Sequence, residues 1–424
     1  MKVALVYLNN DKLIGRGAGY IAMAVYEAGH YLDFFDTAWT TQEQVEKAIT
    51  STHYDVLMVS ITSFYYQRMK HLVDTFKSHC NSPVLVGGPH ATVIGNKMLI
   101  DCPSVDCVCV GEGEVLVTEY LNYLENGSPS KGLKNIAGIC YRTGDGHILE
   151  NKPGPPTDLH SLKPFNFEYF NPKSVVRDGE LIPGFCYVQA TRGCPFRCSY
   201  CCNSYFIALY GKGFLRTQNI DTVIAELKHL KANYPVELFY FGDEMILFDR
   251  AYATELFQRV HDEIQMPYGC MFRVEAATQE MVDVMKNTGC RYVSAGIECG
   301  DEKFRKEYLN RRMTNDNIIT AFRRLRGIPN VWITSYNMRG YPVSFDDRLT
   351  SATVALNKQV APNHVQTTWF YPIPGTPMHD YCVKRDLIDD SAVSAEDYFL
   401  KSIIRHPVSA ELDKPLYGQN GKRG

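Results

Sequence analysis

The chain has 424 residues, which exceeds the usual size of one domain and predicts two or three domains with sizeable buried cores. Lysine and arginine together number 44 against 47 aspartate and glutamate residues, so the net charge is only -3. Because this balance leaves no basic excess, the composition argues against free-standing nucleic-acid binding and against attachment to an anionic membrane.

Residues 1–7 run directly into a strand pattern, without the charged region, apolar run and cleavage site of a signal peptide. No apolar run approaches the roughly 20 residues that a membrane helix needs. These two features predict a cytoplasmic protein. In that compartment the 14 cysteines are expected to be thiols or metal ligands rather than disulfides. Isolated ones, such as Cys80, Cys140, Cys270 and Cys382, are expected to be small buried side chains.

Residues 1–125 alternate short apolar runs with helical patterns, which is typical of a parallel sheet covered on both faces. We therefore predict one doubly wound, Rossmann-like α/β domain. The expected strands cover 3–8, 31–35, 56–61, 84–87 and 107–110, and the expected helices lie near 20–27, 42–49, 67–77 and 114–124.

Residues 126–185 are predicted to form a connector between two domains. Apolar residues 139–141 and 147–149 flank Thr143-Gly144-Asp145-Gly146, which is a hairpin signal. The prolines of the following stretch disfavour a helix or a central strand; they are Pro153, Pro155, Pro156 and Pro164.

Residues 186–385 show six further strand and helix pairs, which predict a partial (β/α)6 barrel of the TIM type. The loops at the carboxyl ends of its strands are then available for chemistry. Residues 386–424 form a short polar tail without an interpretable pattern. The six expected strands cover 187–191, 238–241, 270–274, 292–297, 331–336 and 365–371.

A cluster of cysteines follows the first expected barrel strand. Cys194, Cys198 and Cys201 fall within eight residues, on a loop at the active end of the barrel, as a cubane cluster held by three thiolates requires. A structural zinc site is disfavoured because no fourth ligand follows at a matching spacing. Cys202 remains an alternative to Cys201 as the third ligand.

The spacing Cys194-x-x-x-Cys198-x-x-Cys201, with Tyr200 before the last cysteine, resembles the signature of radical S-adenosylmethionine (SAM) enzymes. The resemblance implies a [4Fe-4S] cluster with one open iron, to which SAM binds through its amino and carboxylate groups. Residues 241–244 resemble the Gly-Gly-Glu motif that receives the SAM amino group, with Asp243 in place of the second glycine. This assigns Gly242, Asp243 and Glu244 to SAM binding.

Residues 272–276 and 296–300 resemble the third- and fourth-strand segments of the cobalamin-linked radical SAM subgroup. This resemblance implies that Arg273 and Glu298 face the SAM carboxylate and ribose, although an ordinary ion pair is the alternative for either residue. Residues 338–342 and 371–377 resemble the fifth- and sixth-strand segments, where glycines and prolines shape turns.

Residues 85–92 and 110–114 resemble the cobalamin-binding domain of the same subgroup. The cobalt-ligating histidine motif of other cobalamin domains is absent, since residues 11–15 carry no histidine, and His90 is expected to be a hydrogen-bonded loop residue. A structural role for the glycine turns remains an alternative. The implied cobalamin contacts come from the strand ends; they are Ser60, Thr62, Gly87, Gly88, Gly111, Glu112 and Gly113.

The resemblance predicts a cobalamin-dependent radical methyltransferase. One SAM would methylate cobalamin, and a second would give a 5′-deoxyadenosyl radical that activates an unactivated carbon of a small metabolite or natural-product intermediate. A flavodoxin or a ferredoxin is the expected reductant. The alternatives are a cobalamin-independent radical dehydratase, epimerase or oxidase of a sugar-like or peptide substrate, and a non-catalytic iron–sulfur or corrinoid module. No catalytic side chain is identified, since Tyr205, Tyr210, Tyr336 and His364 are better explained by packing or hydrogen bonding.

Overall fold

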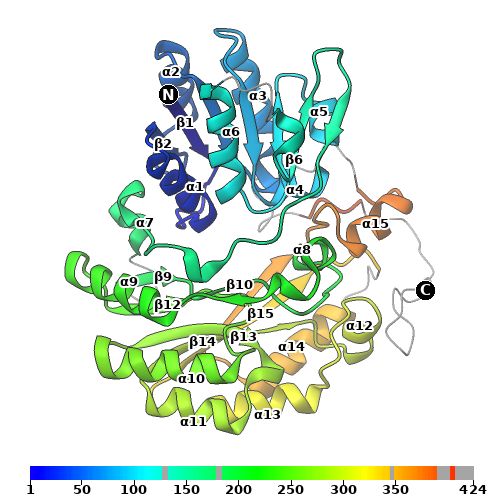
Figure 1. The fold of residues 1–424 in the computed structure, drawn as a ribbon. Coiled ribbons are helices and arrows are strands. Elements are labelled where there is room, and N and C mark those ends of the chain that lie inside the picture. The colour runs from blue at the N-terminus through cyan, green and yellow to red at the C-terminus, as the bar shows by residue number, and fades with distance from the viewer. Residues whose placement is uncertain (127–131, 178–183, 344–347, 389–401, 406–424) are drawn as a thin grey trace. The chain divides into compact units, whose positions relative to one another are not determined.

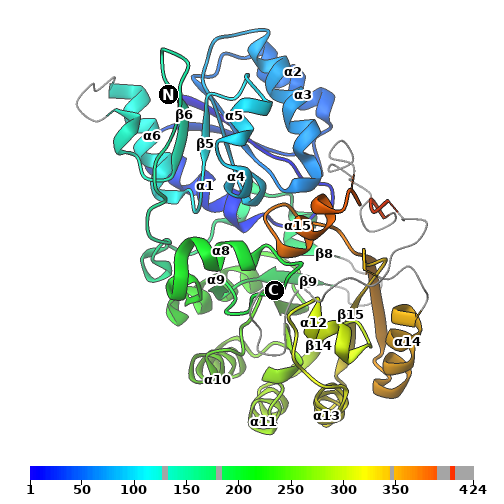
Figure 2. The ribbon, with the colours of Figure 1, turned by 90° about the vertical axis from the view of Figure 1, so that its right-hand side faces the viewer.

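A computed structural model describes residues 1–126, 132–177, 184–343, 348–388 and 402–405 (Figures 1 and 2). The described chain divides into two compact units, each considered by itself below. The first contains residues 1–158 and 165–175, and the second contains residues 159–164, 176–388 and 402–405. No described helix is both long and apolar enough to cross a membrane.

The first unit is built on a sheet with the strand order β2-β1-β3-β4-β5-β6-β7, counted within the described part of the chain. Strands β1 to β5 are parallel, whereas β6 is antiparallel to both β5 and β7. The strands are β1 Lys2–Tyr7, β2 Tyr31–Asp36, β3 Val56–Ser60, β4 Val84–Gly87, β5 Cys107–Cys109, β6 Ile139–Arg142 and β7 Ile148–Glu150.

Helices cover both faces of this sheet, as predicted for a doubly wound domain. One face packs on α1 and α6 through Ala22, Val25, Val117 and Leu121. The other face packs on α2 and α3, whose buried residues include Val45, Ile49, Met69 and Phe76. The helices of this unit are α1 Arg16–Glu27, α2 Gln42–Ser51, α3 Tyr66–Lys77, α4 Pro89–Ile94, α5 Lys97–Asp101, α6 Glu114–Asn126 and α7 Pro172–Val175.

The order β2-β1-β3-β4 creates a switch point between β1 and β3. From β1 the chain continues to β2 on one side of this point, and from β3 it continues to β4 on the other side. Doubly wound sheets bind ligands beyond the carboxyl ends of the strands at such a point. The loops that follow β1, β3, β4 and β5 therefore form the candidate binding edge of the first unit.

The predicted hairpin is confirmed, since β6 and β7 pair with Cys140 opposite Glu150 and Arg142 opposite Ile148. It extends the first sheet through β5 instead of standing apart as part of a connector. Residues 126–185 are thus divided between the two units. The exact domain boundaries stay a prediction.

Gly88 offers a test of how tightly the turn after β4 is built. Its φ angle is +100°, and an added Cβ atom would lie 2.5 Å from the carbonyl oxygen of Ile61. Gly88→Ala is therefore expected to lower the free energy of unfolding by about 2 kcal/mol or more, measured by urea unfolding. Gly17→Ala in helix α1 is the control, because an added Cβ atom there would meet nothing within 4 Å. This substitution is expected to stabilise the protein slightly. Equal effects of the two changes would contradict this interpretation.

The second unit contains a sheet with the order β16-β15-β14-β13-β12-β9-β8 in the described residues. The six strands from β9 to β16 in this sheet are parallel and follow chain order, while β8 is antiparallel to β9. This is the predicted partial barrel. Its strands are β8 Val176–Arg177, β9 Phe185–Val188, β12 Leu238–Phe241, β13 Tyr268–Arg273, β14 Cys290–Glu298, β15 Trp332–Arg339 and β16 His364–Trp369.

Helices follow each parallel strand and bury apolar side chains such as Leu227, Phe257, Met285 and Phe322. They are α8 Asn203–Tyr210, α9 Ile220–Asn233, α10 Arg250–Arg259, α11 Gln279–Asn287, α12 Glu302–Glu307, α13 Asn315–Leu325, α14 Arg348–Val360 and α15 Pro377–Lys384. A separate antiparallel pair is formed by β10 Thr191–Arg192 and β11 Arg216–Thr217.

The first barrel strand ends earlier than predicted. We expected it to cover 187–191, but β9 ends at Val188 and the chain turns out of the sheet, so that Thr191 pairs with Thr217 instead. The physical reason is the buried carboxylate of Asp243, which accepts hydrogen bonds from the backbone amides of Ala190 and Thr191.

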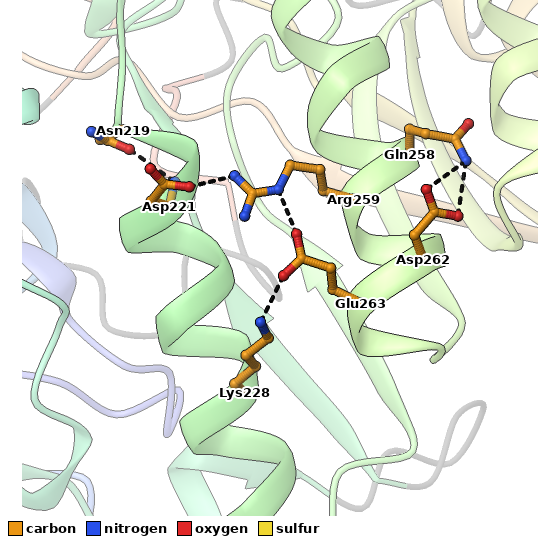
Figure 3. Close-up of polar contacts among 7 residues, drawn as sticks. All are labelled: Asn219, Asp221, Lys228, Gln258, Arg259, Asp262 and Glu263. Carbon is orange, nitrogen blue, oxygen red and sulfur yellow. Dashed lines mark hydrogen bonds and ion pairs between the residues drawn. The ribbon is translucent and has the colours of Figure 1, made fainter.

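An ion-pair network links helices α9 and α10 on the outer surface of the barrel (Figure 3). Arg259 donates to Glu263 at 2.6 Å and to Asp221 at 2.5 Å, and Lys228 lies 2.6 Å from Glu263. These cations lower the pKa of Glu263 to about 2. The network connects the two helices. It contributes little to the free energy of unfolding, because solvent screens exposed ion pairs.

Candidate functional site

The cysteine loop begins at a glycine turn and is tied to the rest of the barrel. Gly193 has a φ angle of +95°, and a Cβ there would lie 2.4 Å from the carbonyl oxygen of Phe214. The backbone amide of Ser199 donates to the carbonyl of Leu309 at 3.2 Å. The backbone carbonyl of Ser199 accepts from the amide of Met378 at 3.0 Å. The loop is therefore fixed from two later segments of the chain.

The three predicted ligands lie near one another in this loop. Cys194 and Cys198 are buried, whereas Cys201 keeps some solvent contact. Burial is the main cause that raises the pKa of Cys194 to about 12, and repulsion between its thiolate and those of Cys201 and Cys198 contributes to the rise. Thiols must ionise to bind a metal, so a bound cation has to offset this penalty.

Among the described residues, no three Cys, His, Asp or Glu side chains are close enough together to hold one metal ion. Ligands of a cubane cluster bind different irons at different corners, so they need not converge on one point. The three-thiol loop fits a cluster in donor type and in number.

Arg273, the last residue of β13, reaches the cysteine loop. Its Nη1 atom donates to the sulfur of Cys198 at 3.1 Å. Its Nε and Nη2 atoms donate to Glu275 at 3.3 and 2.5 Å. The guanidinium group also lies over the ring of Phe196, 3.8 Å from its centroid. Arg273 is therefore held on three sides.

A second buried arginine, Arg311, joins the cysteine loop to strand β14. It donates to the hydroxyl of Tyr200 at 3.1 Å and to the carbonyl of Gly296 at 2.6 Å, and it lies 3.4 Å from the carboxylate of Glu298. Its Nε atom is buried without a hydrogen-bond partner in the part of the chain that the structure describes. Sequence reasoning missed Arg311, because Arg311-Arg312 lies outside every strand-end motif and reads as solvated surface.

Glu298 stands at a strained position at the end of β14. Its φ angle is +65°, and the pairing of β14 with β15 shifts register between Gly296 and Glu298. Such backbone outliers cost of order 1–3 kcal/mol each and occur mostly at functional sites. The hydroxyl of Tyr341 donates to the Glu298 carbonyl at 3.1 Å and holds this bulge.

The residues of the predicted Gly-Gly-Glu-like segment differ in their contacts: two shape the backbone, and one is accessible to a ligand. Gly242 packs against Tyr187, whose hydroxyl donates to the Gly242 carbonyl at 2.9 Å. The buried Asp243 accepts from Ala190, Thr191 and the Thr191 hydroxyl, so its carboxylate shapes the turn. Glu244 keeps solvent contact although surrounding protein raises the pKa of its carboxyl by partial desolvation. Of the three, Glu244 is the one positioned to meet a ligand.

At the candidate edge of the first unit, β3 and β4 bring four predicted residues together. Ser60 is paired in register with Gly87, and the loops beyond carry Thr62 and Gly88. Thr62 Oγ1, Tyr66 Oη and His90 Nε2 are buried without a hydrogen-bond partner among the described residues. Unsatisfied buried polar atoms are rare and require an explanation such as a ligand.

The remaining predicted residues of that edge have structural contacts. Gly111 has a φ angle of +101° and donates its amide to Thr92 at 3.1 Å. The Glu112 carboxylate accepts from the Thr157 amide at 2.7 Å. A Cβ on Gly113 would lie 2.9 Å from Ile21, so this glycine allows α6 to approach α1.

His90 is hydrogen-bonded, as expected, but it belongs to helix α4 rather than to a loop. Its Nδ1 atom lies 2.9 Å from the hydroxyl of Ser63. Burial lowers its pKa to about 4, so the ring is neutral. The Tyr66 ring packs 4.7 Å from it, centroid to centroid.

Two known protein families match this chain, one in each of its two units. The radical SAM superfamily matches residues 188–350, and the B12 binding domain matches residues 10–121. The chain is a radical SAM enzyme with an N-terminal B12-binding domain.

Two curated relatives of this radical SAM enzyme are methyltransferases by name. One is an uncharacterized methyltransferase of Pyrococcus horikoshii, 26% identical over 92% of this chain and 84% of its own length. The other is cytidylyl-2-hydroxyethylphosphonate methyltransferase of Streptomyces wedmorensis, 26% identical over 53% of this chain and 46% of its own length.

A solved structure shares the fold. It is the radical SAM methyltransferase TsrM of Kitasatospora setae, with cobalamin and a [4Fe-4S] cluster bound. The two structures superpose with a TM-score of 0.70 at 15% sequence identity, and the match covers 91% of this chain and 75% of the TsrM chain.

The cofactors of this radical SAM enzyme are a [4Fe-4S] cluster, SAM and cobalamin. The cobalamin-independent alternative leaves the B12-binding domain without a role. Several observations fit these groups: the three-thiol loop fits the cluster, the unpaired Nε of Arg311 and the accessible Glu244 fit SAM, and the unpaired atoms beyond β3 and β4 fit a corrin. The individual contact residues stay predictions.

Proposed function

We propose that this radical SAM enzyme is a cobalamin-dependent methyltransferase that acts on an unactivated carbon of a small metabolite or natural-product intermediate. The single observation that carries the proposal is the presence, in one chain, of the three-thiol barrel loop and the B12-binding domain. The methyltransferase names of the two relatives described above support it. TsrM has been solved with a tryptophan substrate, which supports a small-molecule substrate here.

When bound, the cluster supplies the electron that cleaves SAM, and cobalamin supplies the methyl group. Cys194, Cys198 and Cys201 would hold the cluster. Glu244 would accept hydrogen bonds from the SAM ammonium, because it presents a carboxylate with remaining acceptor capacity.

Other side chains of the barrel would orient rather than react. Arg311 joins Tyr200 through a hydrogen bond and Glu298 through an ion pair, and these contacts fix the strand end on which SAM would lie. Asp243 holds the turn after β12 against the start of the cysteine loop. Pre-organisation of this kind lowers the entropic cost of aligning reactants. We also propose a flavodoxin or a ferredoxin as the reductant.

The proposal predicts that two SAM-derived products appear together. Anaerobic protein supplied with cobalamin, reductant, SAM carrying a deuterated methyl group and a small-molecule extract should form S-adenosylhomocysteine and 5′-deoxyadenosine. A metabolite in the extract should gain the deuterated methyl group, detected by mass spectrometry. Formation of 5′-deoxyadenosine without S-adenosylhomocysteine would exclude methyl transfer and favour another radical reaction.

A further inference from the structure

The contact between Arg273 and Cys198 carries an inference beyond cofactor binding. We infer that Arg273 is a positioning residue that sets the reduction potential of the cluster by donating a hydrogen bond to a ligand sulfur. The inference rests on the cluster alone, and it does not require that the proposed methyl transfer be correct.

The hydrogen bond is direct and is made by a cation. Arg273 Nη1 lies 3.1 Å from Cys198 Sγ, and only 7% of the Arg273 surface is exposed. A hydrogen bond from a charged donor is roughly twice as strong as one between neutral groups. Because water is excluded, the interaction is weakly screened.

The donor is held rigidly in place. Glu275 accepts from both Nε and Nη2, which fixes the plane of the guanidinium group. Phe196, from the cysteine loop itself, lies against its face at 3.8 Å. The short segment Val274–Ala276 that follows β13 brings Glu275 back toward Arg273. The backbone thus orients both Arg273 and its hydrogen-bond acceptor Glu275.

A rigid cationic donor affects the two oxidation states differently. Reduction adds negative charge to the cluster and its sulfur ligands, so the hydrogen bond from the guanidinium group stabilises the reduced state more than the oxidised one. Hydrogen bonds to cluster sulfurs are a main determinant of reduction potential. Arg273 therefore raises the potential and makes delivery of the first electron easier.

Arg311 is a second cation that acts on Cys198 among the described residues, but its contacts differ. Its hydrogen bonds go to Tyr200 and Gly296, and its carboxylate partner is Glu298. It acts on the sulfur only through space, whereas Arg273 donates to it. The structure therefore distinguishes a hydrogen-bond donor from a neighbouring charge.

The test is the midpoint potential of the reconstituted [4Fe-4S] cluster in the full chain, measured by redox titration followed by electron paramagnetic resonance, without SAM. Arg273→Met keeps an unbranched apolar stem, shorter than that of arginine, and removes the donors. We expect the equilibrium constant for one-electron reduction to fall about tenfold or more, which corresponds to about 59 mV. Arg273→Lys, which keeps the charge, should give a smaller fall.

Arg339→Met is the matched control. Arg339 is an exposed arginine at the end of β15 that also lies over an aromatic ring, 4.2 Å from the centroid of Trp369. Its removal should leave the potential unchanged. An unchanged potential in Arg273→Met with full iron content would overturn the inference. So would a folded Arg273→Met protein without a cluster, since Arg273 would then serve assembly.

A second measurement needs no variant. Wild-type protein labelled with ¹⁵N-arginine should show an isotropic nitrogen coupling to the reduced cluster in pulsed electron paramagnetic resonance, because such a coupling is transmitted through the hydrogen bond of Arg273 and not through space from Arg311. Absence of any coupling would overturn the inference even if the variants failed to fold. Neither readout depends on SAM cleavage or methyl transfer, so failure of the proposed function would leave this result interpretable.

Discussion

Replacing Cys198 with alanine is expected to abolish cluster binding and, with it, all detectable reductive cleavage of SAM. Cys198 is buried at the centre of the cysteine loop and receives the hydrogen bond from Arg273, so a substitute ligand has no access to that position. Iron content of the anaerobically reconstituted protein and 5′-deoxyadenosine formation are the two measurements. Cys194→Ala and Cys201→Ala should behave in the same way.

Cys202→Ala is the matched control, because this thiol is adjacent to Cys201 and belongs to the same loop. It should retain iron and SAM cleavage. If Cys202→Ala lost the cluster while Cys201→Ala kept it, the third ligand would be Cys202. If Cys198→Ala retained full iron and activity, the assignment of the cysteine loop would be wrong.

The largest effect on stability is expected at Asp243. Its fully buried carboxylate accepts from the amides of Ala190 and Thr191 and from the Thr191 hydroxyl at 2.7 Å. Asp243→Ala leaves these donors buried and unpaired, which is expected to cost about 3 kcal/mol of unfolding free energy. Asp243→Asn keeps an acceptor oxygen, and it should cost much less in a thermal unfolding experiment at neutral pH.

The same residue predicts a pH dependence. Burial is the main cause that raises the pKa of Asp243 to about 7, from about 3.8 in the unfolded chain. Between these values the native state binds more protons, so the contribution of this group to stability falls as pH rises from about 4 to 7 and is constant above that range. Asp243→Asn should therefore gain stability relative to wild type across this window.

Melting temperatures of both proteins from pH 5 to 8 test this sign. A difference between wild type and Asp243→Asn that stays constant over the range would contradict the buried, protonatable carboxyl. A difference that grows in the opposite direction would indicate a salt-bridged carboxylate instead.

Much of the fold was predictable, because parallel strands covered on both faces are continuous apolar runs. The strands at Val84–Gly87 and Leu238–Phe241 have the predicted bounds, since a glycine or a polar turn ends each run. The end of β9 was not predictable, because it depends on Asp243, more than 50 residues later in the chain. Local pattern carries no information on such long-range hydrogen bonds.

The candidate site was predictable only where its residues follow one another in sequence. The spacing of Cys194, Cys198 and Cys201 is local and specific. Arg311 and Tyr341 reach Glu298 from separate segments, and neither belongs to a motif of fixed spacing. The contact of Arg273 with a cysteine sulfur likewise requires the curvature of the barrel, which brings β13 to the loop after β9.

One chain is expected to hold both an iron–sulfur cluster and a corrinoid. This can be checked by elemental analysis of protein that has been reconstituted anaerobically with iron, sulfide and hydroxocobalamin and then desalted. We predict about four iron atoms for a [4Fe-4S] cluster, together with about one cobalt atom per chain and no stoichiometric zinc. Stoichiometric zinc in place of iron, or cobalt that is lost completely on desalting, would contradict the presence of both cofactors.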